Sequence, residues 1–418
     1  MQPEKHTQLV DHLFRHEAGK MVAILARLFG FDRLEVAEDL VQDTFTLAFE
    51  TWKLKGIPDN PQAWLYTVAK NKSLDYVRRQ QRFQKVAGEI RRDVPLEYTL
   101  TAQIENAFFH IRDSQLQMLF AVCHPAITPE AQVALALKTL CGFSVEEIAR
   151  SFLTQRETIK KRLLRAREKI RSEGIRMEMP AENALSERLD SVLTCIYLLF
   201  TEGYHSSTQE MLLRKDLCLE AMRLCLLLLE TPATRQPQVS ALMALMCFHS
   251  SRFDSRLSPS GTMLAWHEQD RSRWNQELIA RGLRYLNDAA EGNHLSSYHL
   301  EAIIAWSHTQ EDSPEKWQRL SDAYQQLRQI NPSPVIALNH AFILSKELSP
   351  EAGIEAALAI NGLEDNYLYH SLLGELYTHK DRALSLRHWE QALQLAHSEA
   401  EKQQIVGKME MLDVRRKT

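Results

Sequence analysis

The chain has 418 residues, 44% hydrophobic and 25% charged, which is the composition of an ordinary globular protein with room for roughly two to four domains. Only 14 glycines and 14 prolines occur, which excludes collagen-like and low-complexity chains. The net charge of −4 is unevenly distributed: residues 1–176 carry 27 Lys and Arg against 22 Asp and Glu, and the remainder carries 23 against 32. A balance of +5 in the front part and −9 in the rear favours a front part that meets nucleic acid.

The six cysteines form no C-x-x-C pair and no zinc-ligand spacing. Cys123, His124 and Cys141 are more typical of a buried core than of a metal site. The first residues lack the apolar stretch of a signal peptide, and no apolar run reaches membrane-spanning length. We therefore expect a cytoplasmic protein that needs no metal and no cofactor.

Two amphipathic helices are predicted at the start of the chain. Apolar spacing predicts the first over 8–29, ended by Gly30, and the second over 34–53. The inner stripe of the second helix consists of Val41, Phe45, Ala48 and Trp52. Its other side, which we expect to face water, carries Glu38, Asp39, Gln42, Asp43 and Glu50.

A loop with two prolines and a glycine follows, and a third helix is predicted to begin at Pro61. This helix mixes aromatic rings with basic and amide side chains, a combination that suits single-stranded DNA because bases stack on rings while cations follow the backbone. The alternative, which composition alone slightly favours, is that Trp64 and Tyr66 are core aromatics on an ordinary charged helix. The polar side chains concerned are Lys70, Asn71, Lys72, Asp75, Arg78, Arg79 and Arg82.

Residues 144–171 predict a helix-turn-helix. Ser144 with Glu147, and Thr154 with Glu157, each resemble a capping box at a helix start. In the second helix an inner side of Ile159, Leu163, Ala166 and Ile170 leaves the other sides to cations, namely Arg156, Lys160, Lys161, Arg162, Arg165, Arg167, Lys169 and Arg171. A charge run alone is often just a solvated face, but the second helix of such a motif can lie in the DNA major groove.

Beyond Arg176 the sequence predicts helices without an evident site. Residues 177–187 resemble a polar hinge, and the apolar stretches after it are too short for membrane spans and flanked by charge. His267, Glu268 and Asp270, with basic neighbours and Trp274, are more typical of a buried polar network than of an acid–base pair. From Pro334 helical hairpins recur, and 367–396 loosely matches a tetratricopeptide unit with Leu373, Gly374, Tyr377, Trp389 and Ala392 at packing positions.

Three segments resemble, in order and spacing, the conserved regions of bacterial RNA polymerase sigma factors of the extracytoplasmic-function group. They are AEDLVQDTF at 37–45, PQAWLYTVAKNKSLDYVRRQQR at 61–82 and the helix-turn-helix at 144–171. The tail resembles the subgroup that carries a C-terminal, tetratricopeptide-like extension. The resemblance implies an all-α chain in five parts: sigma region 2 at 1–83, a linker at 84–106, sigma region 4 at 107–176, a helical extension at 177–330 and tetratricopeptide-like repeats at 331–418.

The same resemblance implies residue roles. Docking on the clamp helices of the polymerase's largest subunit falls to Asp39, Gln42, Asp43 and Phe45. Binding of the melted −10 element falls to the loop 53–60 and to Trp64, Lys70, Asn71, Arg78 and Arg79. Recognition of the −35 element falls to Arg156, Thr158, Lys160, Lys161, Arg162 and Arg165.

The expected function is that of a promoter-specificity subunit without catalysis of its own, which binds core RNA polymerase and both double- and single-stranded promoter DNA. Regulation through the tail is expected. A protein partner on the repeats and a purely architectural packing role are the two interpretations of this part. One alternative is an autonomous helix-turn-helix regulator with a tetratricopeptide sensor, which would have no need of the segment 37–82. Another is a helical scaffold whose basic helix is incidental.

Overall fold

A computed structural model describes residues 3–86, 110–152, 154–205, 211–256, 264, 269–292, 294–396 and 399–414. Within these ranges the regular elements are helices and no strand occurs, which confirms the all-α class. Every helix there is too short or too polar to cross a lipid bilayer. The chain divides into two compact units, Met1–Arg235 and Gln236–Thr418. The five-part division expected from the sequence remains a prediction.

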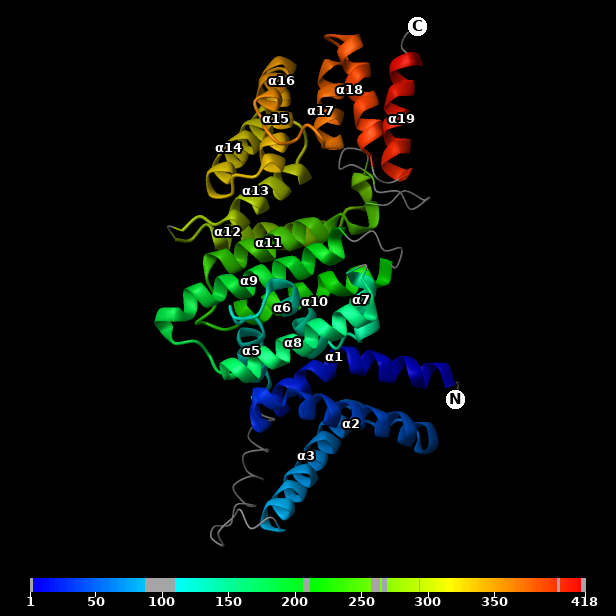
Figure 1. Cartoon of the computed structure of the whole chain (residues 1–418), viewed down its shortest axis with the longest axis vertical. Coiled ribbons are helices and arrows are strands. Elements are labelled where there is room, and N and C mark those ends of the chain that lie inside the picture. Colours follow the sequence, from blue (N-terminus) through cyan, green and yellow to red (C-terminus); the bar gives the residue numbers. More distant parts are fainter. Residues whose placement is uncertain are drawn as a thin grey trace. The chain divides into compact units, whose positions relative to one another are not determined.

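The first unit contains the segments with the predicted functional residues (Figure 1). Its helices are α1 (Pro3–Phe29), α2 (Leu34–Lys55), α3 (Pro61–Val86), α5 (Ile111–Val122), α6 (Pro129–Thr139), α7 (Val145–Ser151), α8 (Arg156–Glu173), α9 (Glu182–His205) and α10 (Met211–Leu229). A short 3₁₀ helix, Phe31–Arg33, joins α1 to α2.

Helices α1 and α2 pack side by side (Figure 1). Gly30 ends α1 with φ +97°, a conformation that side chains other than glycine's rarely adopt. The whole predicted inner stripe of α2 is buried, but α2 continues to Lys55, two residues past the predicted end. It stops where Gly56 takes φ +85°. The loop that was predicted to begin at Lys53 is therefore confined to 56–60.

Helix α6 forms the centre of the second helical group in this unit. Its residues 131–137 are all buried, as expected for a helix that is covered on every side. Helices α5, α8 and α9 cover it, so part of its cover comes from beyond the helix-turn-helix.

Helices α9 and α10 belong to the first unit, although the sequence places them in the tail. The Arg188 guanidinium on α9 donates a hydrogen bond of 2.5 Å to the Phe120 carbonyl oxygen at the end of α5. From α10, Arg223 donates one of 3.0 Å to the Leu140 carbonyl oxygen, just past α6. The two helices thus donate hydrogen bonds to carbonyl groups of buried residues at the C-terminal ends of α5 and α6.

The second unit is a succession of helices, each packed on the next along the chain (Figure 1). They are α11 (Pro237–Ser251), α12 (Gln276–Ala289), α13 (Ser297–Thr309), α14 (Pro314–Ile330), α15 (Pro334–Glu347), α16 (Pro350–Leu358), α17 (Tyr367–Tyr377), α18 (Arg382–Leu395) and α19 (Glu399–Val414). Among the described residues between α11 and α12, Phe253–Ser255 and Arg271–Arg273 each form a 3₁₀ helix.

The hairpin of α17 and α18 confirms the predicted packing of the tetratricopeptide-like unit. Leu373, Trp389 and Ala392 are buried at its centre. At Gly374 a Cβ atom would lie only 2.9 Å from Cδ2 of Trp389, so the absence of a side chain lets the indole lie against α17.

Candidate nucleic-acid interface

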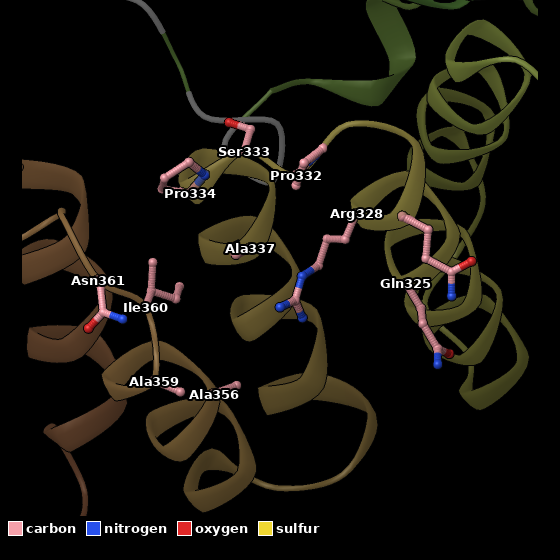
Figure 2. A pocket seen from close by; sticks show the side chains of 11 residues that line it. Gln325, Arg328, Pro332, Ser333, Pro334, Ala337, Ala356, Ala359, Ile360 and Asn361 are labelled. Atoms are coloured by element: carbon pink, nitrogen blue, oxygen red, sulfur yellow. The ribbon is translucent and has the colours of Figure 1, made fainter.

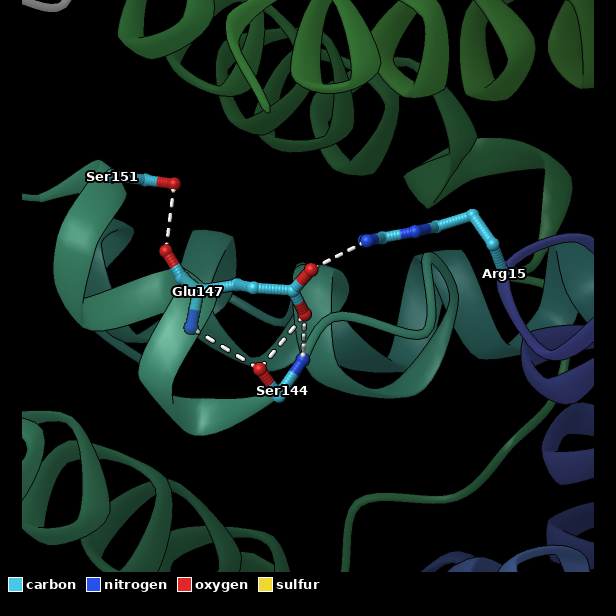
Figure 3. A network of polar contacts seen from close by, with 4 residues as sticks. All are labelled: Arg15, Ser144, Glu147 and Ser151. Atoms are coloured by element: carbon cyan, nitrogen blue, oxygen red, sulfur yellow. Dashed lines mark hydrogen bonds and ion pairs between the residues drawn. The ribbon is translucent and has the colours of Figure 1, made fainter. Parts of the chain in front are cut away.

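A helix-turn-helix forms where the sequence predicted it, and its first helix is capped as expected. The Ser144 amide donates to the Glu147 carboxylate at 2.8 Å, and the Glu147 amide donates to the Ser144 hydroxyl at 3.2 Å. Figure 3 shows this reciprocal pair, with Arg15 of α1 reaching the same carboxylate. Burial alone would raise the pKa of Glu147, but hydrogen bonds from Ser144 and Arg15 lower it below its ordinary value.

The second predicted capping box is wrong. Helix α8 begins at Arg156 after an N-cap of Gln155, whose side chain makes no capping hydrogen bond. The Thr154 amide instead donates to the Ala149 carbonyl oxygen at 2.9 Å, which closes the turn between the two helices. The Glu157 carboxylate accepts a hydrogen bond from Lys160 at 2.8 Å along the outside of α8. Residue spacing allows a capping box here, but the backbone of the turn places Thr154 one residue too early for it.

Helix α8 has the predicted inner side. Ile159, Leu163, Ala166 and Ile170 are buried against the rest of the first unit. The candidate −35 residues lie on the remaining sides: Arg156, Lys160, Lys161 and Arg165 are exposed, while Thr158 and Arg162 are half-buried.

Several of these cations already have partners. The Nε atom of Arg156 lies 2.7 Å from a carboxylate oxygen of Glu146 on α7, across the turn. The Arg162 guanidinium lies 5.9 Å from the centre of the Phe152 ring. Among the described residues, Lys161 and Arg165 form no ion pair, so they are the most available for phosphate or base contacts.

Two cations of α8 pair with carboxylates of α2: Arg167, which the sequence analysis placed in water, is largely covered, whereas Arg171 stays exposed. Nη2 of Arg167 lies 2.5 Å from the Glu38 carboxylate on α2, and Nη2 of Arg171 lies 2.7 Å from the Glu35 carboxylate. The side chains of Arg167 and Glu38 are only 19% and 16% exposed. The expectation that Glu38 stays outside is therefore wrong, because α8 covers this part of α2.

The four candidate polymerase-docking residues of α2 differ in exposure to solvent. Asp39, Gln42 and Asp43 are exposed, and Lys72 of α3 lies 3.7 Å from Asp43. Phe45 is only 5% exposed, with its ring edge-on to Phe14 of α1 at 5.0 Å between centroids. Phe45 thus supports this face from beneath, whereas the three polar residues can touch a partner.

The candidate −10 residues lie along α3, which begins at Pro61 as predicted. The Asn60 side chain caps the helix by accepting a hydrogen bond of 2.9 Å from the Ala63 amide. Trp64 is half-buried, edge-on to the Trp52 ring at 5.3 Å. Of the polar candidates Asn71, Arg78 and Arg79 are exposed and Lys70 is half-buried.

Tyr66 takes the alternative role of a core aromatic. Its hydroxyl donates a 2.9 Å hydrogen bond to the Glu17 carboxylate of α1, and burial raises the pKa of this phenol well above its ordinary value. Its polar end is thus engaged inside the bundle. Trp64, like Tyr76 farther along this helix, is half-buried.

Other predicted features lie partly outside the described residues. Of the predicted linker 84–106, the structure describes only the part that ends at Val86. The polar cluster near Trp274 is described without His267 and Glu268. Its Asp270 caps a 3₁₀ helix by accepting from the Ser272 amide at 2.9 Å, and Trp274 is buried. The contacts of Asp270 and Trp274 thus stabilise the local fold.

The cysteines lie in the cores of the two units, as the sequence analysis favoured. All six are buried, and burial raises the pKa of the Cys123 and Cys141 thiols. Among the described residues, no group of three or more potential ligands could hold a metal ion.

The second unit has a groove of about 570 Å³ between α14, α15 and α16. In Figure 2, Ala337 and Ile360 both lie to the left of the Arg328 guanidinium, and Gln325 lies to its right. Nη1 of Arg328 lies 3.4 Å from Nδ1 of His340. This imidazole is buried, and both burial and the neighbouring Arg328 lower its pKa. The lining residues include no carboxylate.

Sequence reasoning missed the residues that join the two helical groups of the first unit. Arg15 of α1 pairs with Glu147 of α7, Gly19 of α1 lies against the Leu140 carbonyl group past α6, and Glu35 of α2 pairs with Arg171 of α8. Nothing in their local pattern distinguishes them from ordinary helix residues. Sequence spacing identifies faces of single helices and not the pairing of faces.

Comparison with known families gives three matches along the chain. Residues 13–83 match sigma-70 region 2, residues 117–170 match sigma-70 region 4, and residues 188–290 match a family of unknown function (DUF6596). The third match begins in α9 and ends just past α12, so it includes residues of both compact units.

Two relatives show how far the similarity extends. The chain is 34% identical over 386 residues to "Uncharacterized protein R00370" of Rhizobium meliloti (strain 1021), which covers 91% of this chain and 90% of that protein. It is 29% identical over 162 residues to "ECF RNA polymerase sigma factor SigE" of Mycolicibacterium smegmatis (strain ATCC 700084 / mc(2)155), covering 38% of this chain and 60% of that protein. No solved structure matches significantly.

Proposed function

Because this chain belongs to the extracytoplasmic-function group of bacterial RNA polymerase sigma factors, in the form with a C-terminal extension, we propose that it directs core polymerase to particular promoters and takes part in opening them. The helix-turn-helix reads the −35 element, and α3 with the loop before it binds the melted −10 element. The proposal assigns no catalytic step to the chain itself.

The observation that carries the proposal is the division of α8 into two sides. The apolar side of α8 is buried. Lys161 and Arg165 lie on its exposed side and form no ion pair among the described residues. Such a helix can enter a major groove while its scaffold stays folded. Because these cations contact DNA phosphates, the affinity for DNA depends strongly on the salt concentration.

Docking on polymerase is assigned to the exposed acids of α2. Asp39 and Asp43 present negative charge on a rigid helix, and opposite charge on a partner guides the two surfaces together. Phe45 supports this face from below.

Promoter opening is assigned to α3. Exposed Arg78 and Arg79 follow the strand's phosphates, and Asn71 can read a base edge once a base leaves the stack. Half-buried Trp64 offers a ring edge near the loop 56–60. The autonomous regulator considered above gives none of these residues a role, and it has no use for the matched region at 13–83.

We also propose that the extension regulates this activity through a protein partner. The groove beside Arg328 supports such a partner, because its small apolar floor accepts an extended segment and its cation favours an acidic one.

Arg156→Ala and Arg165→Ala test the DNA-binding part of the proposal. On a promoter selected by the holoenzyme from a genomic library, each change should weaken binding by about 1–3 kcal/mol if the lost contact is to a base. A lost phosphate contact should instead reduce the slope of log affinity against log salt by about one. Arg281→Ala on α12 is the matched control, since it removes an exposed, ion-paired arginine of the second unit.

Glu146→Gln is a second control, because it releases Arg156 from its ion pair and should not weaken binding. Unchanged promoter affinity in both arginine variants would remove α8 from the recognition surface. Equal, tight and sequence-specific binding with and without core polymerase would favour the autonomous regulator.

A further inference from the structure

Arg156, at the start of α8, is held by a carboxylate from the other helix of the helix-turn-helix. Its Nε atom lies 2.7 Å from Oε1 of Glu146, the second residue of α7. Lys160, in contrast, pairs at 2.8 Å with Glu157 of its own helix. The turn between α7 and α8 thus brings one acid and one arginine together at the place where the second helix begins.

Both partners of this ion pair lie on backbone that the fold fixes. Helix α7 is capped by Ser144, so Glu146 belongs to a well-defined first turn. The turn to α8 is closed by the hydrogen bond of 2.9 Å from the Thr154 amide to the Ala149 carbonyl oxygen. Arg156 is the first residue of α8, and residues at the start of the second helix are the ones that reach base edges. The pair is therefore placed where sequence can be read.

The exposure of the pair argues against a role in folding. The side chains of Arg156 and Glu146 are 57% and 51% exposed. An exposed ion pair adds little stability, because water screens the charges and both side chains lose freedom. An acid in the first turn also interacts favourably with the helix dipole, but that interaction needs no arginine. The pairing with Arg156 therefore calls for a role in binding.

The contact with Glu146 leaves one edge of the Arg156 guanidinium open. A guanidinium carries five N–H donors in a planar fork. Glu146 lies at Nε, and the two Nη atoms form no ion pair or hydrogen bond with the residues that the structure describes. Such a pair of donors can bind O6 and N7 of a guanine in the major groove. Because the side chain is already directed, less binding free energy is lost in ordering it on DNA.

Charge decides between a phosphate and a base as the target of Arg156. The carboxylate of Glu146 neutralises the arginine and repels a phosphate that approaches the same place. The acceptors on a guanine edge carry no net charge, so the N–H donors remain effective there. A neutral pair thus gives up affinity for DNA of any sequence and keeps affinity for guanine, which widens the difference between right and wrong sites.

We propose that Glu146 is a positioning residue for base recognition, which directs the Nη edge of Arg156 towards a guanine of the −35 element and keeps this arginine from phosphates. The proposal rests on the proposed function, because it names how one residue of the assigned DNA-binding surface selects sequence. Glu146 contacts no base itself and acts through Arg156.

Promoter duplexes that contain 7-deazaguanine test the pair directly. This base keeps its pairing edge but has a carbon atom in place of N7, so it removes one acceptor for Arg156. It replaces, one at a time, each guanine in the −35 element of a promoter selected by the holoenzyme. With the unaltered full-length chain in the holoenzyme, binding in a mobility-shift assay should weaken by about tenfold at one guanine. Arg156→Ala should show no further loss at that guanine.

Glu146→Gln should separate affinity from discrimination. Affinity for the unmodified promoter should not fall and affinity for unrelated DNA should rise, because the lost negative charge favours every DNA. The loss caused by 7-deazaguanine should shrink from about tenfold to about threefold or less, because Arg156 is no longer directed. A merely structural role of Glu146 would change binding to all duplexes alike and leave that ratio as it was.

Glu277→Gln is the matched control. Glu277 is likewise the second residue of its helix, α12, and forms an exposed ion pair with Arg281. Its replacement removes an equal charge from the same position of a helix in the second unit. The loss of binding caused by 7-deazaguanine should therefore stay at the value of the unaltered chain.

Two results would overturn the proposal. One is an equal loss of binding to the 7-deazaguanine promoter in the unaltered chain and in Glu146→Gln. The other is a promoter in which no guanine of the −35 element responds. Either result, obtained together with promoter-specific transcription, would leave the proposed function intact. Absence of any promoter-specific start site would instead refute the proposed function, and this proposal with it.

Discussion

Truncation within the extension should show that α9 and α10 complete the fold around the helix-turn-helix. A chain stopped after Arg176 loses both helices, whereas one stopped after Arg235 keeps the whole first compact unit. Sequence alone favours the first position as the end of the sigma part. The structure favours the second.

The magnitude follows from what α9 and α10 cover. Cys123 and Cys141 are fully buried beside Cys195 of α9. Arg188 donates a hydrogen bond to a backbone carbonyl group in the last turn of α5, and Arg223 donates one to a carbonyl group just past α6. If only three apolar side chains lose their cover, the cost is about 5–9 kcal/mol, at about 1.5–3 kcal/mol each. That is comparable to the whole stability of a small domain.

Urea unfolding followed by circular dichroism is the assay for the two truncated chains. The 1–235 chain should unfold in one cooperative transition, and the 1–176 chain should lack a comparable transition for its second helical group. Phe200→Ala in the full chain offers an independent check, because this buried α9 side chain should cost about 3–5 kcal/mol. Equal midpoints and slopes for the two truncated chains would refute the reasoning.

Three further predictions concern single residues. Gly374→Ala should destabilise the second unit by about 1–3 kcal/mol in urea unfolding, because the new Cβ atom would overlap the Trp389 ring, whereas Gly407→Ala, with open space around it, should be neutral or slightly stabilising. His308 is buried with its pKa lowered to about 3, so the stability that depends on its neutral form is complete above pH 6.5 and is lost as pH falls towards 3. Between pH 7 and pH 5 the unit should lose about 2 kcal/mol, and His308→Gln should remove that dependence. Ser144→Ala should destabilise the first unit by about 1 kcal/mol, since the α7 cap is lost.

Each of these predictions can be contradicted. Equal unfolding midpoints for the two glycine variants would mean that α17 shifts freely from the indole of Trp389. A pH dependence that persists in His308→Gln would assign it to another group. No change in Ser144→Ala would mean that the hydrogen bond from Arg15 alone holds Glu147 and the start of α7.

Patterns within one helix were predictable from the sequence. The buried side of α8 followed from the spacing of Ile159, Leu163, Ala166 and Ile170, and the capping box at Ser144 followed from residue type. The same residue pattern gave a wrong prediction of a capping box at Thr154, because cap formation depends on the backbone of the turn as well as on the residue types.

Contacts between helices were not predictable. From their charges, Glu38 and Arg167 were predicted to face water. The sequence does not show that these two side chains form an ion pair with each other. The apolar stretches in α9 and α10 are largely buried, although Leu198, Leu219 and Leu226 are exposed, and helices that are apolar on most sides carry no mark of their partner. For that reason the sequence separated these helices from the group they complete.

Transcription of fragmented genomic DNA by purified core polymerase, with every 5′ end mapped, tests the central claim most directly. With the full-length chain present, the account predicts start sites that are missing with core alone and that share two sequence elements at a constant spacing. Arg165→Ala should deplete these sites, and the Arg281→Ala control should not. If the chain binds core polymerase yet adds no start site, or if the added sites share no such elements, the account is contradicted.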